Sequence, residues 1–146
     1  MNESIDISSI MIGDHCKIEK LIDDLEEKTS YDFDDMKKSF NQLEWEIEKH
    51  IFAEEKAIFT SYNPTDVKEG YKILPELTKQ HNYIINQMNK WRNDIKNKRK
   101  ITDIFSFKKY IIKHKKYEEK EVYPRLDKSL DFEQKKKIIS KIKEII

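Results

Sequence analysis

The chain is short of turn-forming residues, of cysteine and of any excess charge. It has two glycines and three prolines among 146 residues, which is too little turn chemistry for a protein built from many strands. Its single cysteine, Cys16, has no second cysteine to pair with, a usage typical of reducing compartments. Lys and Arg together number 29 and Asp and Glu 28, so the net charge of +1 excludes the basic footprint of a nucleic-acid-binding protein.

The chain also lacks long apolar runs and the signs of a secretory leader. No stretch approaches the roughly 18–20 apolar residues that a membrane-spanning helix needs. The opening Met1–Asp6 segment is acidic, whereas a signal peptide opens with a basic region. A length of 146 residues fits one domain, residues 1–146. We therefore predict a cytoplasmic single-domain protein that has neither a membrane nor a nucleic acid as a partner.

Hydrophobic periodicity predicts helices along the whole chain, because apolar residues recur at spacings of three and four. The helices are expected at about residues 8–28, 34–61, 75–97, 103–123 and 131–146. Pro64 is expected to end the second helix and Pro124 the fourth, while Pro75 is tolerated in the first turn of the third. Asp131 and Gln134 have the spacing of a capping box at the start of the last helix. Short connections favour an all-α, up-down-up-down four-helix bundle with an additional C-terminal helix.

All four histidines of the chain belong to a duplicated pattern. The run HIFAEE, which begins at His50, is echoed by HKKYEE, which begins at His114. The other two histidines, His15 and His81, each stand three residues before an isoleucine. Residues four apart lie on one face of a helix, with about 5–6 Å between their Cβ atoms. Each His-x-x-x-Glu pair can therefore hold one metal ion or bridge to a second.

Six polar side chains would face the apolar interior of the predicted bundle. They are His15, His50, Glu54, His81, His114 and Glu118. A lone histidine on an apolar face is more often a core residue with satisfied hydrogen bonds than a ligand. Here, however, burying unpaired imidazoles costs free energy, and burying isolated carboxylates costs more. Two divalent cations bridged by the two carboxylates would satisfy all six groups at once, so we predict a metal site.

At these residues the chain resembles the hemerythrin family, specifically its short bacterial and archaeal HHE cation-binding members. The resemblance extends from about Ile10 to Pro124. It rests on the order His, HxxxEE, His, HxxxEE, with an aliphatic-aromatic pair and then Pro124 after the second copy. It implies a hemerythrin-like bundle with a non-haem di-iron centre that takes up dioxygen or reacts with related small oxidants.

Carried over position by position, the resemblance implies two irons, each held by two histidines and both bridged by two glutamates. The ligands would be His15 and His50 for one iron, His81 and His114 for the other, and Glu54 and Glu118 for the bridges. Manganese and zinc remain alternatives, because His/Glu sites accept all three metals. A ferritin-like site would need Glu-x-x-His, and here Ile or Thr stands three residues before each histidine.

The chain departs from the oxygen-carrying hemerythrins at one ligand. Those proteins have a fifth histidine one turn from the third-helix histidine, where this sequence has Leu77 and Ile85, which cannot bind a metal. We therefore expect open or water-filled coordination positions, which suit turnover or labile binding at least as well as reversible carriage. Glu19 and Glu121 could each supply a further ligand, although a glutamate that extends to water is the simpler interpretation.

Other residues near the pattern are expected to have supporting roles. Glu55 and Glu119 lie about 100° further round their helices than the bridging glutamates. We expect them to be surface carboxylates or hydrogen-bond partners of the ligands. Cys16 is expected to be a small buried hydrophobe. Tyr110 and Tyr117 flank the fourth-helix histidine; they could hydrogen-bond an oxygen species, but such spacing more often indicates core residues.

A heptad stripe of aromatic residues lies opposite the histidine of the second helix. It comprises Trp45, Phe52 and Phe59, and three large aromatic side chains facing water would be unusual. The stripe should be covered by the amino-terminal arm, by the final helix or by another subunit in a homo-oligomer.

The predicted function is that of a non-haem di-iron protein that stores, delivers or senses dioxygen. An enzyme-like alternative is the turnover of peroxide or nitric oxide, or the donation of iron for repair of iron centres, at the same site. A structural or signalling module is less favoured, because no output domain is attached. An oxygen- or metal-binding protein is preferred to an enzyme, and no catalytic residue is assigned.

Overall fold

The computed structural model describes residues 6–61 and 67–146, with the side chains of all of these except residues 61 and 67–72. This part of the chain is helical and contains no strand. Its α-helices are α1 (Ile7–Lys28), α2 (Phe33–Ala53), α3 (Val67–Lys96), α4 (Ile104–Tyr117), α5 (Tyr123–Ser129) and α6 (Phe132–Ile145). The predicted all-α class is confirmed. None of the described helices is long and apolar enough to cross a membrane.

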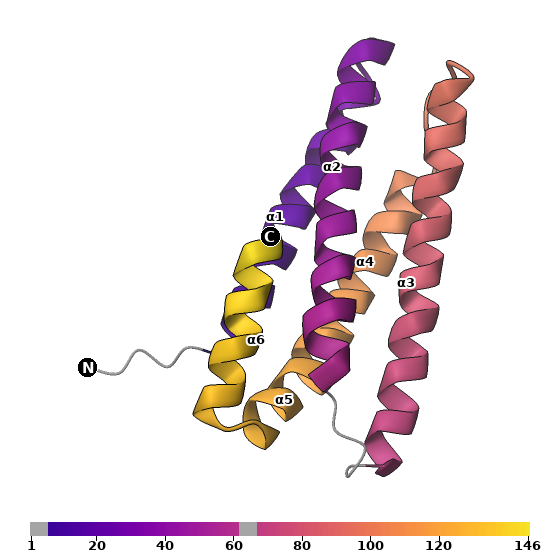
Figure 1. The fold of residues 1–146 in the computed structure, drawn as a ribbon. Coiled ribbons are helices and arrows are strands. Elements are labelled where there is room, and N and C mark those ends of the chain that lie inside the picture. The colour runs from indigo at the N-terminus through magenta and orange to yellow at the C-terminus, as the bar shows by residue number, and fades with distance from the viewer. Residues whose placement is uncertain (1–5, 62–66) are drawn as a thin grey trace.

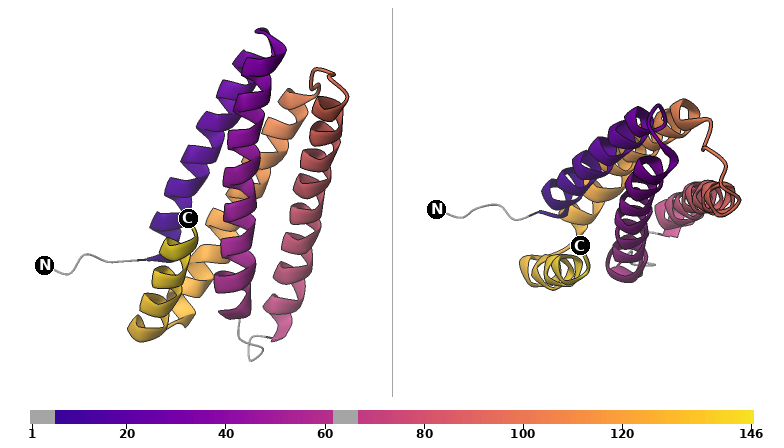
Figure 2. Two further views of the ribbon diagram at one scale, coloured as in Figure 1. Left: turned by 45° about the horizontal axis from the view of Figure 1, so that its top comes forward. Right: turned by 90° about the horizontal axis from the view of Figure 1, so that it is seen from above.

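The first four helices form the predicted up-down-up-down bundle, in which α1 and α3 run one way and α2 and α4 the other (Figure 1). At the foot of the bundle α5 turns the chain, and α6 runs back beside the lower half of α1 and α2 (Figure 2). Asp127 of α5 accepts hydrogen bonds from the backbone N–H groups of Ile7 and Ser8, at 2.9 and 3.2 Å. These bonds fix α5, which leads into the final helix, to the bundle at the end where α1 begins.

Three helices begin at aspartates whose side chains cap the first turn. Asp6, Asp32 and Asp131 each accept a hydrogen bond from the backbone N–H three residues further on, at the start of α1, α2 and α6. Gln134 completes the capping box with Asp131, as the sequence predicts. Such a cap stabilises a helix by about 1 kcal/mol, which explains why these helices begin where they do.

Two prolines do not mark the boundaries that the sequence predicts, and a third, Pro64, lies outside the described residues. Pro75 lies inside α3 rather than at its start. The buried side chains of Ile73 and Leu77 on either side of it hold this part of α3 against the interior, which outweighs the helix-breaking tendency of proline. Pro124 does not close a helix but stands in the first turn of α5, where its missing N–H costs no hydrogen bond.

The interior consists of two apolar clusters with a layer of polar side chains between them. The upper cluster comprises Ile18, Ile22, Leu25, Met36, Phe40, Leu43, Ile47, Ile51, Ile84, Met88, Trp91, Ile95, Ile101, Ile104, Phe107 and Ile111. The lower cluster comprises Ile7, Met11, Ala57, Ile58, Ile73, Leu77, Val122, Tyr123, Leu126, Ile138, Ile139 and Ile142. Each of the four bundle helices passes from one cluster to the other through a histidine. The apolar residues of α6 help to close the lower cluster.

Candidate metal centre

The structure brings together all six polar residues that the sequence singles out. We call them the polar layer: His15 on α1, His50 on α2, His81 on α3, His114 on α4, and Glu54 and Glu118 from the segments after α2 and α4. Each of the six is at most 4% exposed. Within the layer, one ligand atom from each of His50, Glu54, His114 and Glu118 lies within 4.8 Å of the others. This spacing is close enough for one bound species to contact residues from α2 and α4.

Each glutamate of the layer contacts histidines from two different helices. Oε1 of Glu54 lies 2.7 Å from Nε2 of His50 and 3.3 Å from Nε2 of His81. Oε1 of Glu118 lies 2.8 Å from Nε2 of His114 and 3.1 Å from Nε2 of His15. The two halves of the layer are thus arranged alike. A carboxylate between two imidazoles is the arrangement that bridging of two cations requires.

Several buried atoms of the layer make no well-aligned hydrogen bond within the described part of the chain, although polar atoms of the layer lie close to some of them. They are Oε1 of Glu54, Oε2 of Glu118, and Nε2 of His81 and His114. A buried polar atom left in this way costs about 1–3 kcal/mol. The Nε2 atoms of His15 and His50 also face each other at only 3.2 Å. Imidazole nitrogen and carboxylate oxygen atoms are common ligands of divalent cations. Cations bound between these atoms would give each of them a partner.

The outward-facing ring nitrogen of every histidine has an oxygen partner. The Nδ1–oxygen distances are 2.8 Å for His15–Glu119, 2.6 Å for His50–Asp14, 3.4 Å for His81–Glu55 and 2.6 Å for His114–Gln80. Gln80 donates its amide nitrogen to Glu76 at 3.1 Å, which leaves its oxygen free to accept. A histidine whose Nδ1–H donates outward offers the lone pair of Nε2 to a metal. All four imidazoles are therefore oriented as ligands would be, with Nδ1 bound on the outside and Nε2 turned into the layer.

The partners of the histidines follow the internal repeat. Glu55 and Glu119, the residues after the two glutamates of the layer, serve the histidines of α3 and α1, as the sequence predicts for partners of the ligands. Asp14 and Gln80 serve the histidines of α2 and α4 and were not singled out from the sequence. The signal was present, because each stands directly before a histidine of the repeat.

Both glutamates of the layer begin a π-helical turn, which the regular periodicity did not predict. The turns are Glu54–Ile58 and Glu118–Val122. In each, the backbone oxygen of the glutamate accepts a hydrogen bond from a residue five further on, Phe59 or Tyr123. A π turn accommodates one residue more than an α turn, so the following side chains are rotated round the axis, and such turns occur frequently at functional sites.

The rotation turns the aromatic residues that follow toward the polar layer. Phe59 stacks on the ring of His81, with centroids 5.3 Å apart and 14° between the planes. The prediction that Phe59 lies on an outer stripe is therefore wrong, because it assumed an unbroken α-helical period. Trp45 and Phe52 do face outward, 60% and 50% exposed, and α6 packs elsewhere. A homo-oligomer through this surface remains a prediction that rests on these two residues.

Tyr123, at the position equivalent to Phe59, is a residue of the site that the sequence analysis missed. Its hydroxyl donates to Oε2 of Glu54 at 3.1 Å and lies 3.4 Å from Nε2 of His15. Burial raises the pKa of Tyr123 well above its usual value, and the neighbouring Glu54 carboxylate raises it further. The phenol therefore keeps its proton. The two copies of the repeat end in a phenol and a phenyl ring, so this end of the centre is asymmetric.

The charges of the layer without a metal are set by burial and by the two nearest carboxylates. Burial alone would lower the pKa of His50, but Glu54 and Asp14 outweigh it and raise that pKa to about 10. Burial, together with the positive charge of His50, lowers the pKa of His15 to about 4. Burial lowers the pKa of His114 to about 3. Burial would raise the pKa of Glu54, but His50 holds it well below its usual value. Near neutral pH the metal-free layer thus contains an imidazolium at His50 and neutral rings at His15 and His114.

A small cavity adjoins the histidines on the side of the upper cluster. Its volume is about 20 Å³, and its walls are His15, His50, His114, Lys115 and five isoleucines, at positions 18, 47, 51, 84 and 111. This is room for about one water-sized molecule. The walls away from the histidines are almost wholly apolar, so the cavity favours an uncharged molecule over an ion.

Neither of the two extra carboxylates considered as ligands lies in the polar layer. Glu19 pairs with Lys115 at 2.6 Å, and Glu121 pairs with Arg125 at 3.1 Å. Leu77, one turn before His81, is fully buried in the lower cluster. Ile85, one turn after His81, is 39% exposed and points away from the centre. The structure therefore places no side-chain donor at the position where the oxygen carriers have a fifth histidine.

Three further residues near the histidines also lie outside the layer. Cys16 is exposed, so the prediction of a buried thiol is wrong; it follows His15 by one residue and is turned toward solvent, not toward the apolar face. Tyr110 stacks on Tyr83 with ring centroids 3.8 Å apart. Tyr117 packs against the lower cluster. Neither tyrosine hydrogen-bonds to a histidine of the layer among the described residues.

Comparison with known proteins agrees with this geometry. The chain matches none of the curated proteins and none of the solved structures with which it was compared. It does match the family model of the hemerythrin HHE cation binding domain over residues 6–126, a range that contains the whole polar layer. Together with the histidine and glutamate cluster, this match supports a metal cofactor. The chain belongs to the hemerythrin HHE cation-binding domain family.

Proposed function

We propose that the protein holds two iron ions in the polar layer and takes up dioxygen, or a related small oxidant, beside them for storage, delivery or sensing. The observation that carries this proposal is the position of each glutamate between histidines of two helices, with every imidazole anchored from outside. This arrangement suits two cations bridged by the glutamates, and each cation would have few protein ligands. Bound ferrous ions would supply the electrons and open coordination positions that dioxygen uptake needs.

The ligands divide between the two ions as the family resemblance implies. His15 and His50, whose Nε2 atoms are 3.2 Å apart, would hold one ion. His81 and His114, whose ring centroids are 5.4 Å apart, would hold the other. Glu54 and Glu118 would bridge them, and the two glutamates reach histidines of both pairs.

The protein's own groups adapt the centre to a small uncharged ligand. Five isoleucines line the 20 Å³ cavity next to His15, His50 and His114. Tyr123 holds Glu54 in place through its hydroxyl and keeps a proton close to His15. The ring of Phe59 covers His81. A small cavity lined largely by isoleucines beside the centre supports the binding of dioxygen more than that of an anion.

One observation supports a second candidate function, the reductive turnover of peroxide or nitric oxide. Such reductions consume protons, and the hydroxyl of Tyr123 holds a proton 3.4 Å from Nε2 of His15. The centre would then turn over its ligand instead of releasing it. Replacing this phenol with Phe, the residue at the equivalent position of the other half, should slow turnover by a larger factor than it weakens reversible uptake.

Anaerobic loading with ferrous iron followed by an oxygen titration, monitored by absorbance, tests the proposal. A near-ultraviolet and visible band that appears with oxygen and disappears when oxygen is removed is the expected result. Bleaching with release of iron would support turnover or iron donation instead. An iron-loaded protein with no response to oxygen, nitric oxide or peroxide would contradict both candidate functions.

A further inference from the structure

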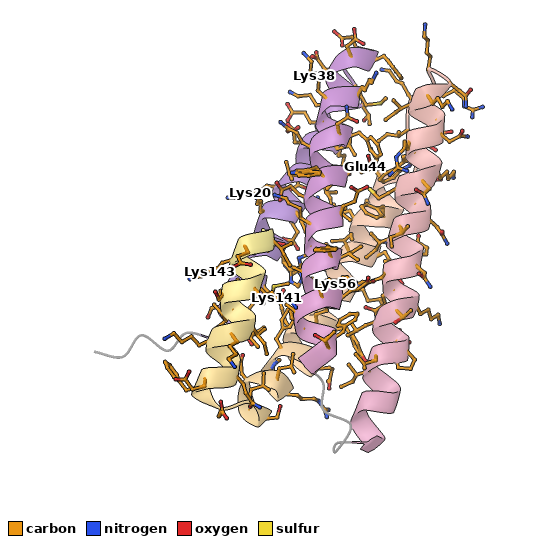
Figure 3. All side chains as sticks on the ribbon, in the orientation of Figure 1. Lys20, Lys38, Glu44, Lys56, Lys141 and Lys143 are labelled. Carbon is orange, nitrogen blue, oxygen red and sulfur yellow. The ribbon has the colours of Figure 1, made fainter. Side chains whose placement is uncertain are left out.

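A groove of about 260 Å³ lies on the surface between α2 and α3. Its floor is apolar and is formed by Ile47, Ile51, Phe52, Ile85 and Met88. Phe52 and Ile85 are half-exposed, so the groove is open to solvent at its outer side. Its outer rim is charged: Arg92 of α3 forms ion pairs with Glu44 and Glu48 of α2. Figure 3 shows Glu44 on the side of α2 that faces α3.

The floor of this groove is also a wall of the small cavity beside the metal centre. Ile47 and Ile51 line both the outer groove and the 20 Å³ cavity next to His15, His50 and His114. Both side chains are nearly buried. The barrier between solvent and the centre is thus one layer of aliphatic side chains. Aliphatic side chains move between staggered rotamers, so a small molecule could pass when these two move.

The groove also touches the centre at a second point. Glu55 lines the groove and accepts a hydrogen bond from Nδ1 of His81 at 3.4 Å. An approaching molecule therefore meets a charged rim first and an apolar floor next. An ion would have to lose part of its hydration shell to move onto the apolar floor, and this desolvation costs free energy. An uncharged diatomic molecule meets no such cost.

The opposite side of the cavity is closed in a different way. Lys115 of α4 lines the cavity and forms an ion pair with Glu19 of α1 at 2.6 Å. A molecule that entered between α1 and α4 would have to separate this pair and pass a charged side chain. On the α2–α3 side, the ion pairs among the described residues that line the groove are those of Arg92 at its rim, and the side chains that separate the groove from the cavity are Ile47 and Ile51.

We propose that the groove between α2 and α3 is the route by which a small uncharged ligand reaches the metal centre, and that Ile47 and Ile51 are its gate. The identity of the ligand rests on the function proposed above. The route itself depends only on the groove, the gate and the cavity, so it can be tested without iron.

The first test maps dissolved dioxygen in protein loaded with diamagnetic zinc. Paramagnetic dioxygen should broaden the NMR signals of the methyl groups along the route, at Ile85, Ile51, Ile47 and Ile84. The methyl groups of Ile142, fully buried in the lower cluster, should be unaffected. The proposal is overturned if the groove methyls respond no more than those of Ile142.

The second test measures the rate at which nitric oxide associates with the ferrous-loaded protein. Ile85→Trp fills the groove from outside and should slow association and dissociation by the same factor, about tenfold, since it raises a barrier without changing the centre. Ile12→Trp is the matched control: Ile12 is 38% exposed and Ile85 39%, but only Ile85 lines the groove. Ile51→Ala should accelerate both rates.

Two outcomes of the rate measurement would overturn the route. In one, Ile85→Trp and Ile12→Trp have the same rates. In the other, Lys115→Met accelerates association while the groove variants leave it unchanged, which would place the route between α1 and α4. A parent protein that binds neither nitric oxide nor dioxygen would refute the proposed function, and the zinc-loaded experiment would still decide the route.

Discussion

Binding of metal to the polar layer should release a proton from His50. In the metal-free protein the carboxylates of Glu54 and Asp14 raise the pKa of His50 to about 10, so its ring is charged at neutral pH. A metal ligand must offer the lone pair of Nε2, and the proton there has to leave. The pKa values of His15 and His114, lowered to about 4 and about 3, mean that these rings are already neutral and release nothing.

The expected magnitude follows from these pKa values. Near pH 7.5, loading should release about one proton per chain from His50. Apparent metal affinity should rise roughly tenfold per pH unit from about pH 6 to about pH 9, because proton and metal compete for one nitrogen. Isothermal titration with zinc in buffers of different ionisation enthalpy measures the number of protons directly. The same titration at several pH values gives the slope.

A matched variant shows whether the proton belongs to His50. Asp14→Asn removes a carboxylate that lies 2.6 Å from Nδ1 of His50, so the pKa of His50 should fall toward its usual value. The metal affinity should then stop rising at a lower pH than in the parent, and metal binding near neutral pH should release fewer protons. Gln80→Glu makes the opposite change beside His114, at the equivalent position. If the parent released no proton and its affinity were the same from pH 6 to pH 9, the charge assignment in the layer would be refuted.

Three further predictions concern stability and metal retention. The metal-free protein should melt markedly lower than the loaded one, because metal-binding free energy becomes folding free energy. Its stability should be greatest near pH 6.5. As the pH rises from there toward about 10, the stability that comes from the raised pKa of His50 is lost, and as the pH falls toward about 4 and about 3, protonation of His15 and His114 destabilises the fold. Leu77→His should add a third imidazole beside His81 and slow the loss of iron to a chelator. Ile85→His, at a position that lines the outer groove, should not slow it. Equal rates of iron loss in the two variants would show that Leu77 does not face an open coordination position. Tyr123→Phe should cost about 1–3 kcal/mol in chemical denaturation, because Oε2 of Glu54 loses its donor, and Tyr117→Phe, outside the layer, is the control that should cost less.

The sequence predicts well those features that depend on a repeated residue pattern. The helical period locates the bundle, and the duplicated histidine and glutamate pattern points to six residues that the structure buries together. Glu55 and Glu119 are also identified, since they recur in both copies. Asp14 and Gln80 differ in residue type but hold equivalent positions, and their role could have been inferred from their place before His15 and His81.

The features that the sequence did not predict arise where tertiary structure changes the local geometry. The π turns at Glu54 and Glu118 interrupt the α-helical period at the site itself, where such turns occur frequently. A constant period of 3.6 residues therefore placed Phe59 on the surface and left Tyr123 out of the site. The sequence predicts a helix start at Pro75, but α3 continues through this residue, and the side chains of Ile73 and Leu77 on either side of it are buried.

The central claim, that the layer holds a bridged pair of ions, is tested most directly by counting metal. Protein loaded anaerobically with ferrous iron should contain two ions per chain, and X-ray absorption should place them about 3.5–4 Å apart. Glu54→Gln and Glu118→Gln should each lose more iron than a substitution of one histidine, because each carboxylate would serve both ions. One ion per chain, with no gain on further addition of iron and no metal–metal distance, would contradict the claim.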